Sequence, residues 1–237
     1  MQLFYNPDID TETKTFSFDK EESRHIIKVL RKNTGDILAI TNGKEQLFWA
    51  SIVVARDKKC TVDISKWEKQ PKTWNYRLHI AIAPTKMNER IEWFLEKATE
   101  IGIDEITPVI CDHSERKHLK MERMEKVIIS AMKQSLKYKL PSLNEPVKFK
   151  DFIHDQTWDL GLIAHCQKAD KKRISDLIAE KNNIMIMIGP EGDFSEAEIK
   201  MSKEKGLIPV SLGESRLRTE TAAIVACNSI AVLKELL

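Results

Sequence analysis

The 237-residue sequence has no long hydrophobic run, no closely paired cysteines and little net charge. No apolar stretch approaches the roughly 20 residues of a membrane-spanning helix, and Gln2 to Asp8 do not have the pattern of a signal peptide. The four cysteines are far apart, which is typical of free thiols in a reducing compartment. Because the formal net charge is only +2, affinity for nucleic acid would have to come from a local patch. We therefore expect a cytoplasmic protein with no membrane partner.

Several motifs of well-known enzyme classes are also missing. The sequence has no G-x-S-x-G elbow of an α/β-hydrolase. It has neither the Lys-Ser/Thr pair of a phosphate loop nor the G-x-G-x-x-G spacing of a dinucleotide site. His113 and His118 are five residues apart, which does not place them on one helix face, so we expect no metal site.

Residues 1–70 are predicted to form a small β-rich module. Asn42-Gly43 lies between apolar runs and indicates a hairpin, and Asp19 with Glu22 resembles a capping box before a short helix. The polar stretch Gln70 to Thr73 contains a proline and marks a domain boundary, so the second domain is expected to cover 71–237. The expected strands are 3–5, 16–18, 37–41, 47–54 and 60–64, a number that favours a small barrel.

From Arg77 onward, strands and helices alternate. This alternation predicts an α/β domain with a largely parallel sheet flanked by helices. Asn88 is expected to cap one helix, and Ser195 with Glu198 forms a capping box for another. The last helix is apolar nearly all round, so it must be covered on several sides. Strands are expected at 78–83, 106–110, 160–164, 184–188 and 207–211, and helices at 88–101, 120–136 and 220–237.

The stretch 184–222 contains two apolar strands that each end in a glycine-containing turn before a helix. Gly189, Gly192 and Gly213 lack side chains and let the backbone approach a ligand closely. In open α/β sheets ligands collect at the carboxyl ends of strands. We therefore predict a ligand site here, for a guest other than a nucleotide phosphate.

Two groups of basic residues are candidate RNA contacts. Residues 113–139 hold eight Lys or Arg against three Glu, an excess of five positive charges. Arg123, Lys126, Lys133 and Lys137 are predicted to share a helix face. That stripe could contact phosphates or could simply be a solvated face. The N-terminal module carries a second cluster, Arg24, Lys28, Arg31 and Lys32.

Three further residues could line the same crevice as the glycine turns. His165 follows the strand 160–164 and could equally be a structural histidine. Glu220 in the first turn of the last helix suits the helix dipole. Arg218 has no such structural role, and its planar cation suits a developing oxyanion or a phosphate.

A series of ordered motifs resembles the RsmE family of SPOUT methyltransferases along nearly the whole chain. The N-terminal motifs His25–Arg31, Gly35-Asp36 and Asn42-Gly43 are similar to the PUA-like barrel of that family. The match continues through Ala83–Lys86, Glu96–Ile103, Ile106–Pro108, Ser114–Arg116, Ala131–Ser135 and Pro141, and its most specific parts are Ile188–Gly192 and Leu217–Ala222.

The resemblance implies a C-terminal SPOUT domain with a trefoil knot and a homodimer. It also implies that the protein uses S-adenosylmethionine to methylate N3 of a uridine in 16S ribosomal RNA of the small subunit. Arg116 joins the expected RNA contacts. We expect Arg218 to stabilise negative charge on the uridine, with Glu220 orienting it or accepting the proton. The cofactor-binding residues implied are His165, Ile188, Gly189, Pro190, Glu191, Gly192, Leu212, Gly213 and Leu217.

Two positions depart from the family pattern. Asp193 stands where the family commonly has a second glycine, and Ser215 stands where it commonly has an arginine, with Arg216 following. Two other functions stay open at this stage. The chain could be a SPOUT enzyme for another nucleotide in rRNA or tRNA, or a non-catalytic RNA-binding or ribosome assembly factor.

Overall fold

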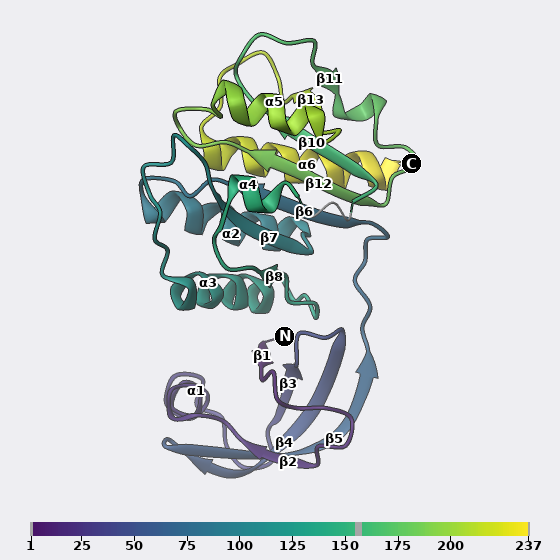
Figure 1. Cartoon of the computed structure of the whole chain (residues 1–237). Coiled ribbons are helices and arrows are strands. Elements are labelled where there is room, and N and C mark those ends of the chain that lie inside the picture. The colour runs from purple at the N-terminus through teal and green to yellow at the C-terminus, as the bar shows by residue number, and fades with distance from the viewer. Residues whose placement is uncertain (1, 155–157, 237) are drawn as a thin grey trace. The chain divides into compact units, whose positions relative to one another are not determined.

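The computed structural model describes residues 2–154 and 158–236, and the chain divides into two compact units (Figure 1). The first unit comprises Met1–Thr73 with Met132–Leu140, and the second comprises Trp74–Ala131 with Pro141–Leu237. The chain therefore returns to the first unit once, in a stretch that the sequence patterns assign wholly to the second domain. Leu237, the predicted last residue of the final helix, lies outside the described residues.

The elements of the first unit are β1 (Leu3–Tyr5), β2 (Thr15–Ser17), α1 (Lys20–Arg24), the π-helical turn η1 (His25–Val29), β3 (Ile37–Thr41), β4 (Gln46–Arg56) and β5 (Lys59–Lys69). Those that follow are β6 (Arg77–Ile82), α2 (Asn88–Ile101), β7 (Glu105–Ile110), α3 (Met121–Gln134), β8 (Ser142–Leu143), β9 (Val147–Lys148), α4 (Phe149–Phe152), β10 (Leu160–Ala164), β11 (Lys172–Arg173), the 3₁₀ turn η2 (Ile174–Asp176), β12 (Asn183–Ile188), α5 (Glu196–Glu204), β13 (Ile208–Ser211) and α6 (Thr219–Leu236).

The first unit is built on a five-stranded sheet, as its β-rich sequence predicts. Its strand order is β1-β3-β4-β5-β2, with β1 parallel to β3 and the other pairs antiparallel. Register shifts at Trp49/Ala50 and Ile52/Val54 bend the long β4–β5 ribbon, as bulges do. The sheet encloses an apolar core that includes Phe4, Phe18, Ile26, Ile40, Phe48 and Val62.

The returning segment 132–140 is held in the first unit by main-chain hydrogen bonds. Glu45 N–H donates to the Tyr138 carbonyl at 2.8 Å, and Leu140 N–H donates to the Gly43 carbonyl at 2.9 Å. The Lys133 ammonium lies 3.1 Å from Glu22 Oε1. The hairpin loop after β3, which Asn42-Gly43 correctly predicts, thus also serves as a docking edge for a distant part of the chain.

The second unit contains a parallel sheet in the order β11-β13-β10-β12-β6-β7-β8, with β9 also pairing with β7. Every strand pair in it is parallel. The chain passes from β12 through α5 to β13, which pairs with β10 on the far side from β12. The strand order thus reverses at β10, and the carboxyl ends on either side face a shared crevice.

Helices cover both faces of this sheet. Met185 and Met187 of β12 pack in one core with Phe149 of α4, Phe194 of the turn before α5 and Ile199 of α5. The alternate strand residues point to the other face, where α6 packs against β6, β12 and α2. The predicted α/β class, with a largely parallel sheet flanked by helices, is confirmed (Figure 1). The trefoil knot stays a prediction.

The helix ends correspond to their sequence signals with two exceptions. Ser195 and Glu198 form the predicted capping box, and the Asp19 carboxylate accepts the Glu22 N–H. The predicted cap at Asn88 is wrong, since Met87 is the N-cap and makes no side-chain capping bond. The helix predicted for 120–136 ends at Gln134, so Lys137 is not on it.

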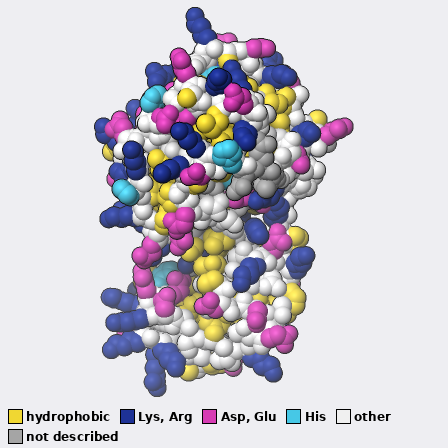
Figure 2. All heavy atoms as spheres, viewed as in Figure 1, with side chains coloured by type: hydrophobic (Ala, Val, Ile, Leu, Met, Phe, Trp, Pro, Cys, Tyr) yellow, Lys and Arg dark blue, Asp and Glu magenta, His cyan; other side chains and the backbone are white. Residues whose placement is uncertain are grey.

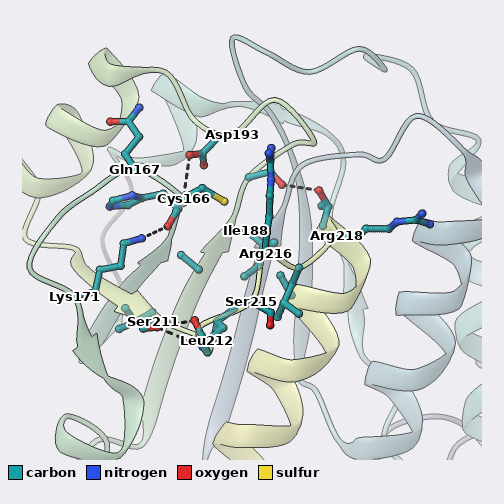
Figure 3. A pocket seen from close by; sticks show the side chains of 18 of the residues that line it. Cys166, Gln167, Lys171, Ile188, Asp193, Ser211, Leu212, Ser215, Arg216 and Arg218 are labelled. Carbon is teal, nitrogen blue, oxygen red and sulfur yellow. Dashed lines mark hydrogen bonds between the residues drawn. The ribbon is translucent and has the colours of Figure 1, made fainter.

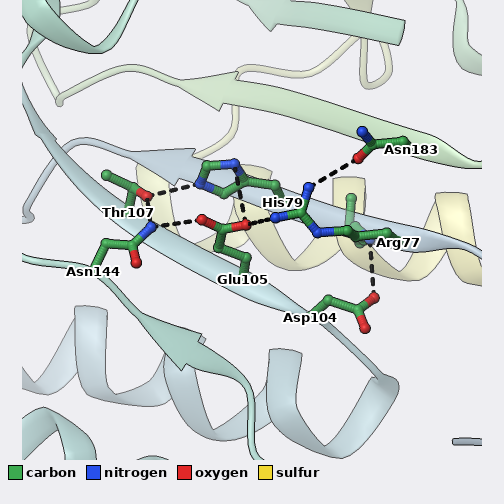
Figure 4. A network of polar contacts seen from close by, with 8 residues as sticks. Arg77, His79, Asp104, Glu105, Thr107, Asn144 and Asn183 are labelled. Carbon is green, nitrogen blue, oxygen red and sulfur yellow. Dashed lines mark hydrogen bonds and ion pairs between the residues drawn. The ribbon is translucent and has the colours of Figure 1, made fainter. Parts of the chain in front are cut away.

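A polar network ties together the amino ends of β6, β7 and β12, opposite the crevice (Figure 4). Arg77 pairs with Glu105 and donates to Asn183 Oδ1 at 3.2 Å. His79 is buried, and its Nε2 lies 2.7 Å from Thr107 Oγ1. Burial lowers the pKa of His79 to about 4, against an opposing effect of Glu105. The imidazole is therefore neutral in the folded protein at pH 7.

This buried histidine makes stability depend on pH. The folded-state pKa of about 4 lies below the ordinary value of 6.5. The unfolded chain therefore binds more protons between these values, and the stabilisation present above pH 6.5 is lost as the pH falls toward 4. Between pH 7 and 4.5, we expect the free energy of unfolding to fall by about 2 to 3 kcal/mol more in the wild type than in His79→Gln. Denaturant titrations at both pH values measure this difference, and equal losses in the two proteins would contradict it.

Candidate functional site

A cavity of about 800 Å³ lies at the carboxyl ends of β10, β12 and β13 in the second unit (Figure 3). Its walls come from the loop after β10, the turn after β12 and the loop between β13 and α6. The volume is within the roughly 300–1,000 Å³ of small-molecule sites. The predicted ligand site at the two glycine turns is thus a real cavity with a third wall at 164–171.

The two turns contain glycine for different physical reasons. A Cβ on Gly189 would lie 2.9 Å from the Phe194 ring, so the close approach there is to the protein's own core. Gly213 has a φ of +131°, a conformation that side chains rarely adopt, and a Cβ on it would meet nothing within 4 Å. The first turn therefore needs glycine for packing, and the second needs it for backbone conformation.

The three walls are joined to one another by hydrogen bonds. Thr219 Oγ1 donates to the Gly189 carbonyl at 3.0 Å, which fixes the start of α6 to the end of β12. Arg216 Nη2 donates to the Glu191 carbonyl at 3.5 Å. Cys166 N–H donates to the Asp193 carboxylate at 2.9 Å, between the loop after β10 and the turn after β12. The cavity therefore has a shape that its own loops maintain.

A fourth loop, residues 111–116 after β7, supports the turn after β12 from outside. His113 Nδ1 lies 3.1 Å from the Gly192 carbonyl and 3.0 Å from the Asp193 carbonyl, so this nitrogen carries the donated hydrogen. Buried Glu198 accepts the Asp112 N–H at 2.9 Å. These contacts connect the amino end of α5 and the turn to the loop after β7, which is two strands away from β12 in the sheet.

Arg116 belongs to the same supporting loop. Its guanidinium donates twice to the Lys86 carbonyl and once to Asn88 Oδ1, the last at 2.7 Å. The Lys86 N–H in turn donates to Glu191 Oε1 at 3.0 Å. Arg116, predicted to contact RNA, is therefore placed where it orders the segment that leads into α2.

His165 is the most unusual polar group of the cavity. The residue is 7 % exposed, and neither ring nitrogen has a hydrogen-bond partner among the described residues. Burial, with the nearby positive Lys171, holds the pKa of His165 below its ordinary value. A neutral imidazole offers one donor and one acceptor, and here both nitrogens are buried without a protein partner among the described residues.

Most predicted cofactor residues line the cavity. Gly192 does not, since it packs against His113. Sequence reasoning missed Lys171, Asp193 and Thr219 as contributors, because their partners are distant in the chain. The predicted residues that line the cavity are His165, Ile188, Gly189, Pro190, Glu191, Leu212, Gly213 and Leu217.

The two predicted catalytic residues are not in contact with each other in the part of the chain that the structure describes. Arg218 lines the cavity and is exposed, and Figure 3 shows its side chain directed away from Cys166 and Asp193. Glu220 is 5 % exposed, and its Oε1 lies 3.7 Å from Arg90 Nε on α2. Glu220 Oε2 is buried without a hydrogen-bond partner among the described residues.

The predicted RNA contacts divide into two kinds. Arg24, Lys28 and Arg31 are exposed on and just after α1 and η1, and Figure 2 shows basic side chains gathered on that side of the first unit. The cations of α3 instead have protein partners. Arg123 pairs with Glu92 through two contacts of 2.6 and 2.8 Å, and Lys126 lies 2.8 Å from Glu122.

The remaining cations of the predicted stripe lie in the first unit. Lys133 pairs with Glu22, and its ammonium is 5.9 Å from the centre of the Phe4 ring. Lys137 follows the end of the helix and is half-buried. The single phosphate-binding stripe predicted for 123–137 is therefore not present as one helix face.

Residues 2–154 and 158–236 contain neither a group of metal-ligating side chains nor a membrane-spanning helix. No three His, Cys, Asp or Glu side chains are grouped as metal ligands would be. No helix in these ranges is long and apolar enough to cross a membrane.

Comparisons with known proteins agree with this architecture. Residues 72–231 match the model of the RNA methyltransferase domain, and residues 18–65 match that of the RNA methyltransferase PUA domain. The ribosomal RNA small subunit methyltransferase E of Buchnera aphidicola is 32 % identical over 93 % of this chain and 89 % of its own length.

Two solved structures are similar over nearly the whole chain. One, described as a probable rRNA-methyltransferase from Porphyromonas gingivalis, is 43 % identical with a TM-score of 0.94, and the match covers 100 % of this chain and 99 % of that one. The other, a Legionella pneumophila protein solved with the cofactor SAM, is 30 % identical with a TM-score of 0.88 over 97 % and 96 % of the two chains. The chain therefore belongs to the ribosomal RNA small subunit methyltransferase E family.

Proposed function

We propose that this protein is an S-adenosylmethionine-dependent methyltransferase that modifies ribosomal RNA of the small subunit, at N3 of a uridine in 16S rRNA. The observation that carries the proposal is the cavity at the carboxyl ends of β10, β12 and β13, with buried His165 offering two unpartnered ring nitrogens. Family membership supplies the reaction class, and the Legionella relative was solved with SAM bound.

The residues of the cavity fit this cofactor. Its volume of about 800 Å³ suits a molecule with an adenine, a ribose and a methionine tail. The neutral His165 ring provides a donor and an acceptor without adding positive charge beside a sulfonium cation. Exposed backbone at Gly213, together with Gly189, Leu212 and Leu217 in the cavity wall, provides the polar and apolar edges that such a ligand needs.

When bound, the cofactor supplies an electrophilic methyl group, so the protein must orient the uridine and stabilise its charge. Uridine N3 loses its proton before or during the formation of the new N–C bond, and negative charge spreads to the flanking carbonyl oxygens. A fixed cation near those oxygens stabilises the transition state more than the ground state. We assign this role to the exposed guanidinium of Arg218.

We assign Glu220 a positioning role. Its carboxylate holds the first turn of α6 against Arg90 of α2, two residues after Arg218. Thr219 fixes the same turn to Gly189. Glu220 would thus orient Arg218 through the backbone at the start of α6.

For RNA contact we propose the cluster Arg24, Lys28 and Arg31, which is exposed in the unit that matches the PUA domain. These residues have no ion pair or hydrogen bond from their side chains among the described residues, unlike the cations of α3. Free basic groups neutralise phosphates without first breaking an existing ion pair. Since its substrate is ribosomal RNA, we place the protein in the cytoplasm.

The function is tested with small ribosomal subunits that lack the modification. Incubation with the protein and S-adenosylmethionine, followed by digestion of the RNA to nucleosides, is expected to yield N3-methyluridine. A methyl group on another nucleotide would contradict the target assignment. Absence of cofactor binding by calorimetry would favour a non-catalytic RNA-binding or assembly factor.

Arg218 is tested in the same assay. Arg218→Ala is expected to lower kcat by roughly 100-fold or more, because a preorganised charge next to the developing anion is removed. Its affinity for the cofactor should change little. Arg216→Ala is the matched control, since Arg216 bonds the Glu191 carbonyl of the cavity wall and should affect cofactor affinity instead. A wild-type rate in Arg218→Ala would exclude the role.

RNA binding is tested by charge reversal of Arg24, Lys28 and Arg31 to Glu. We expect weaker binding and a slope of log affinity against log salt that is reduced by roughly 2 to 3, because about three phosphate contacts are lost. The control reverses Arg56, Lys58 and Lys59, which are exposed in the same unit and change the net charge equally. Equal losses in both variants would show a general effect of charge and refute the site.

We further propose a homodimer formed through α6. Although the helix is apolar, it leaves Val232 43 % and Leu236 77 % exposed, which a second copy would cover. Sedimentation equilibrium at micromolar concentration should report a dimer, and Val232→Glu should shift it toward monomer. Val53→Glu, at a valine that is 40 % exposed in the first unit, is the control. A monomeric wild type would refute the dimer.

A further inference from the structure

We infer that Asp193 and Lys171 clamp the peptide group between His165 and Cys166 and thereby position His165 for the cofactor. The inference rests on the proposed function for its ligand, and on the contacts of this chain for its geometry. Asp193 and Lys171 both line the cavity, from the turn after β12 and the loop after β10. Neither residue binds the peptide through its own backbone, so the clamp consists of two side chains.

The two contacts are made to opposite ends of one peptide group. The Cys166 N–H donates to Asp193 Oδ2 at 2.9 Å, and the Lys171 ammonium donates to the His165 carbonyl (Figure 3). The anion is thus at the positive end of the peptide dipole and the cation at the negative end. Hydrogen bonds in which one partner is charged are shorter and stronger than those between neutral groups. This arrangement fixes the plane of the peptide.

The conformation of Asp193 shows that its side chain matters. Its φ is +66°, in the left-handed region that favours glycine. Asp tolerates this region better than most residues with a side chain, but glycine tolerates it best. A glycine at this position would adopt the backbone conformation most easily, whereas an aspartate also accepts a hydrogen bond from the loop after β10. The carboxylate is therefore the feature that the rest of the site uses.

Hydrogen bonds hold the backbone of Asp193 at both its N–H and its carbonyl. Its N–H donates to the Pro190 carbonyl at 2.9 Å, and its own carbonyl accepts from His113 Nδ1 at 3.0 Å. With both backbone groups engaged, the side chain is aimed across the crevice at the loop after β10. The supporting loop 111–116 thus transmits its rigidity to the wall that carries His165.

The peptide group sets the position of the imidazole. His165 precedes the clamped N–H directly and contributes the clamped carbonyl itself, so rotation of this peptide would move its Cα and its ring. The residue is 7 % exposed, and its two ring nitrogens are buried with no hydrogen-bond partner among the described residues. A ring that makes no hydrogen bonds of its own depends on packing and on its backbone for orientation. The clamp fixes the backbone.

The experiment compares Asp193→Gly with Asp193→Asn. The glycine variant relieves the backbone and removes the acceptor, whereas the asparagine variant keeps an acceptor in a residue that tolerates positive φ. We expect Asp193→Gly to bind S-adenosylhomocysteine about tenfold more weakly by calorimetry, the effect of losing one good hydrogen bond. Its thermal unfolding midpoint should be equal to or above that of the wild type. Asp193→Asn should stay within about threefold of the wild type in affinity.

A second readout does not depend on any ligand. Without ligand, amide hydrogen exchange at Cys166 should be faster in Asp193→Gly than in the wild type, and Lys171→Met should share the loss of affinity. Asp170→Asn is the charge control, because Asp170 is exposed beside Lys171 and does not line the cavity. Unchanged exchange and unchanged affinity in Asp193→Gly would overturn the clamp. If the wild type bound no cofactor at all, the proposed function would fail while the exchange measurement still tested the clamp.

Discussion

Backbone groups that leave a parallel sheet lose their ladder partners, and the structure depends on how three neighbouring strand ends replace them. The Gly189 carbonyl accepts from Thr219, the Glu191 carbonyl from Arg216, and the Cys166 N–H donates to Asp193. Each of these hydrogen bonds joins two walls of the cavity. Because together they connect all three walls, the cavity is preformed, and a change in one wall is transmitted to the next.

Elements with a local pattern could be predicted from the sequence within a few residues. The strand at 160–164 and the capping box at Ser195 are correct because hydrophobic runs and caps are set by neighbouring residues. The return of 132–140 to the first unit could not be predicted, since it depends on hydrogen bonds from Glu45 and Leu140 across the chain. The same applies to the charges of α3. A count of cations does not reveal that Glu92 and Glu22 neutralise two of them.

The candidate site also has parts that could be predicted from the sequence and parts that could not. Its three loops follow from strands that end in glycine turns, which is a short-range signal. The residues that hold those loops were missed because their partners lie far away in sequence: Asp193 acts on Cys166, and Arg90 pairs with Glu220. Asp193 also illustrates why a departure from a family pattern needs a structure. Its positive φ keeps the backbone of a glycine, while its carboxylate adds a contact that glycine cannot make.

The two proposed tasks of the site, cofactor binding and methyl transfer to RNA, need opposite charges. A sulfonium cofactor is positively charged, and the cavity presents to it a neutral imidazole and the carboxylates of Glu191, Asp193 and Glu214. Two cations of its walls, Lys171 and Arg216, are each bonded to a backbone carbonyl of the protein. The RNA substrate is negatively charged and needs a cation at the point of methyl transfer. Arg218 lines the same cavity, but its side chain is directed away from the loops that hold Cys166 and Asp193. Its charge therefore opposes the bound cofactor less than a guanidinium inside the cavity would, and it is free to act on the base.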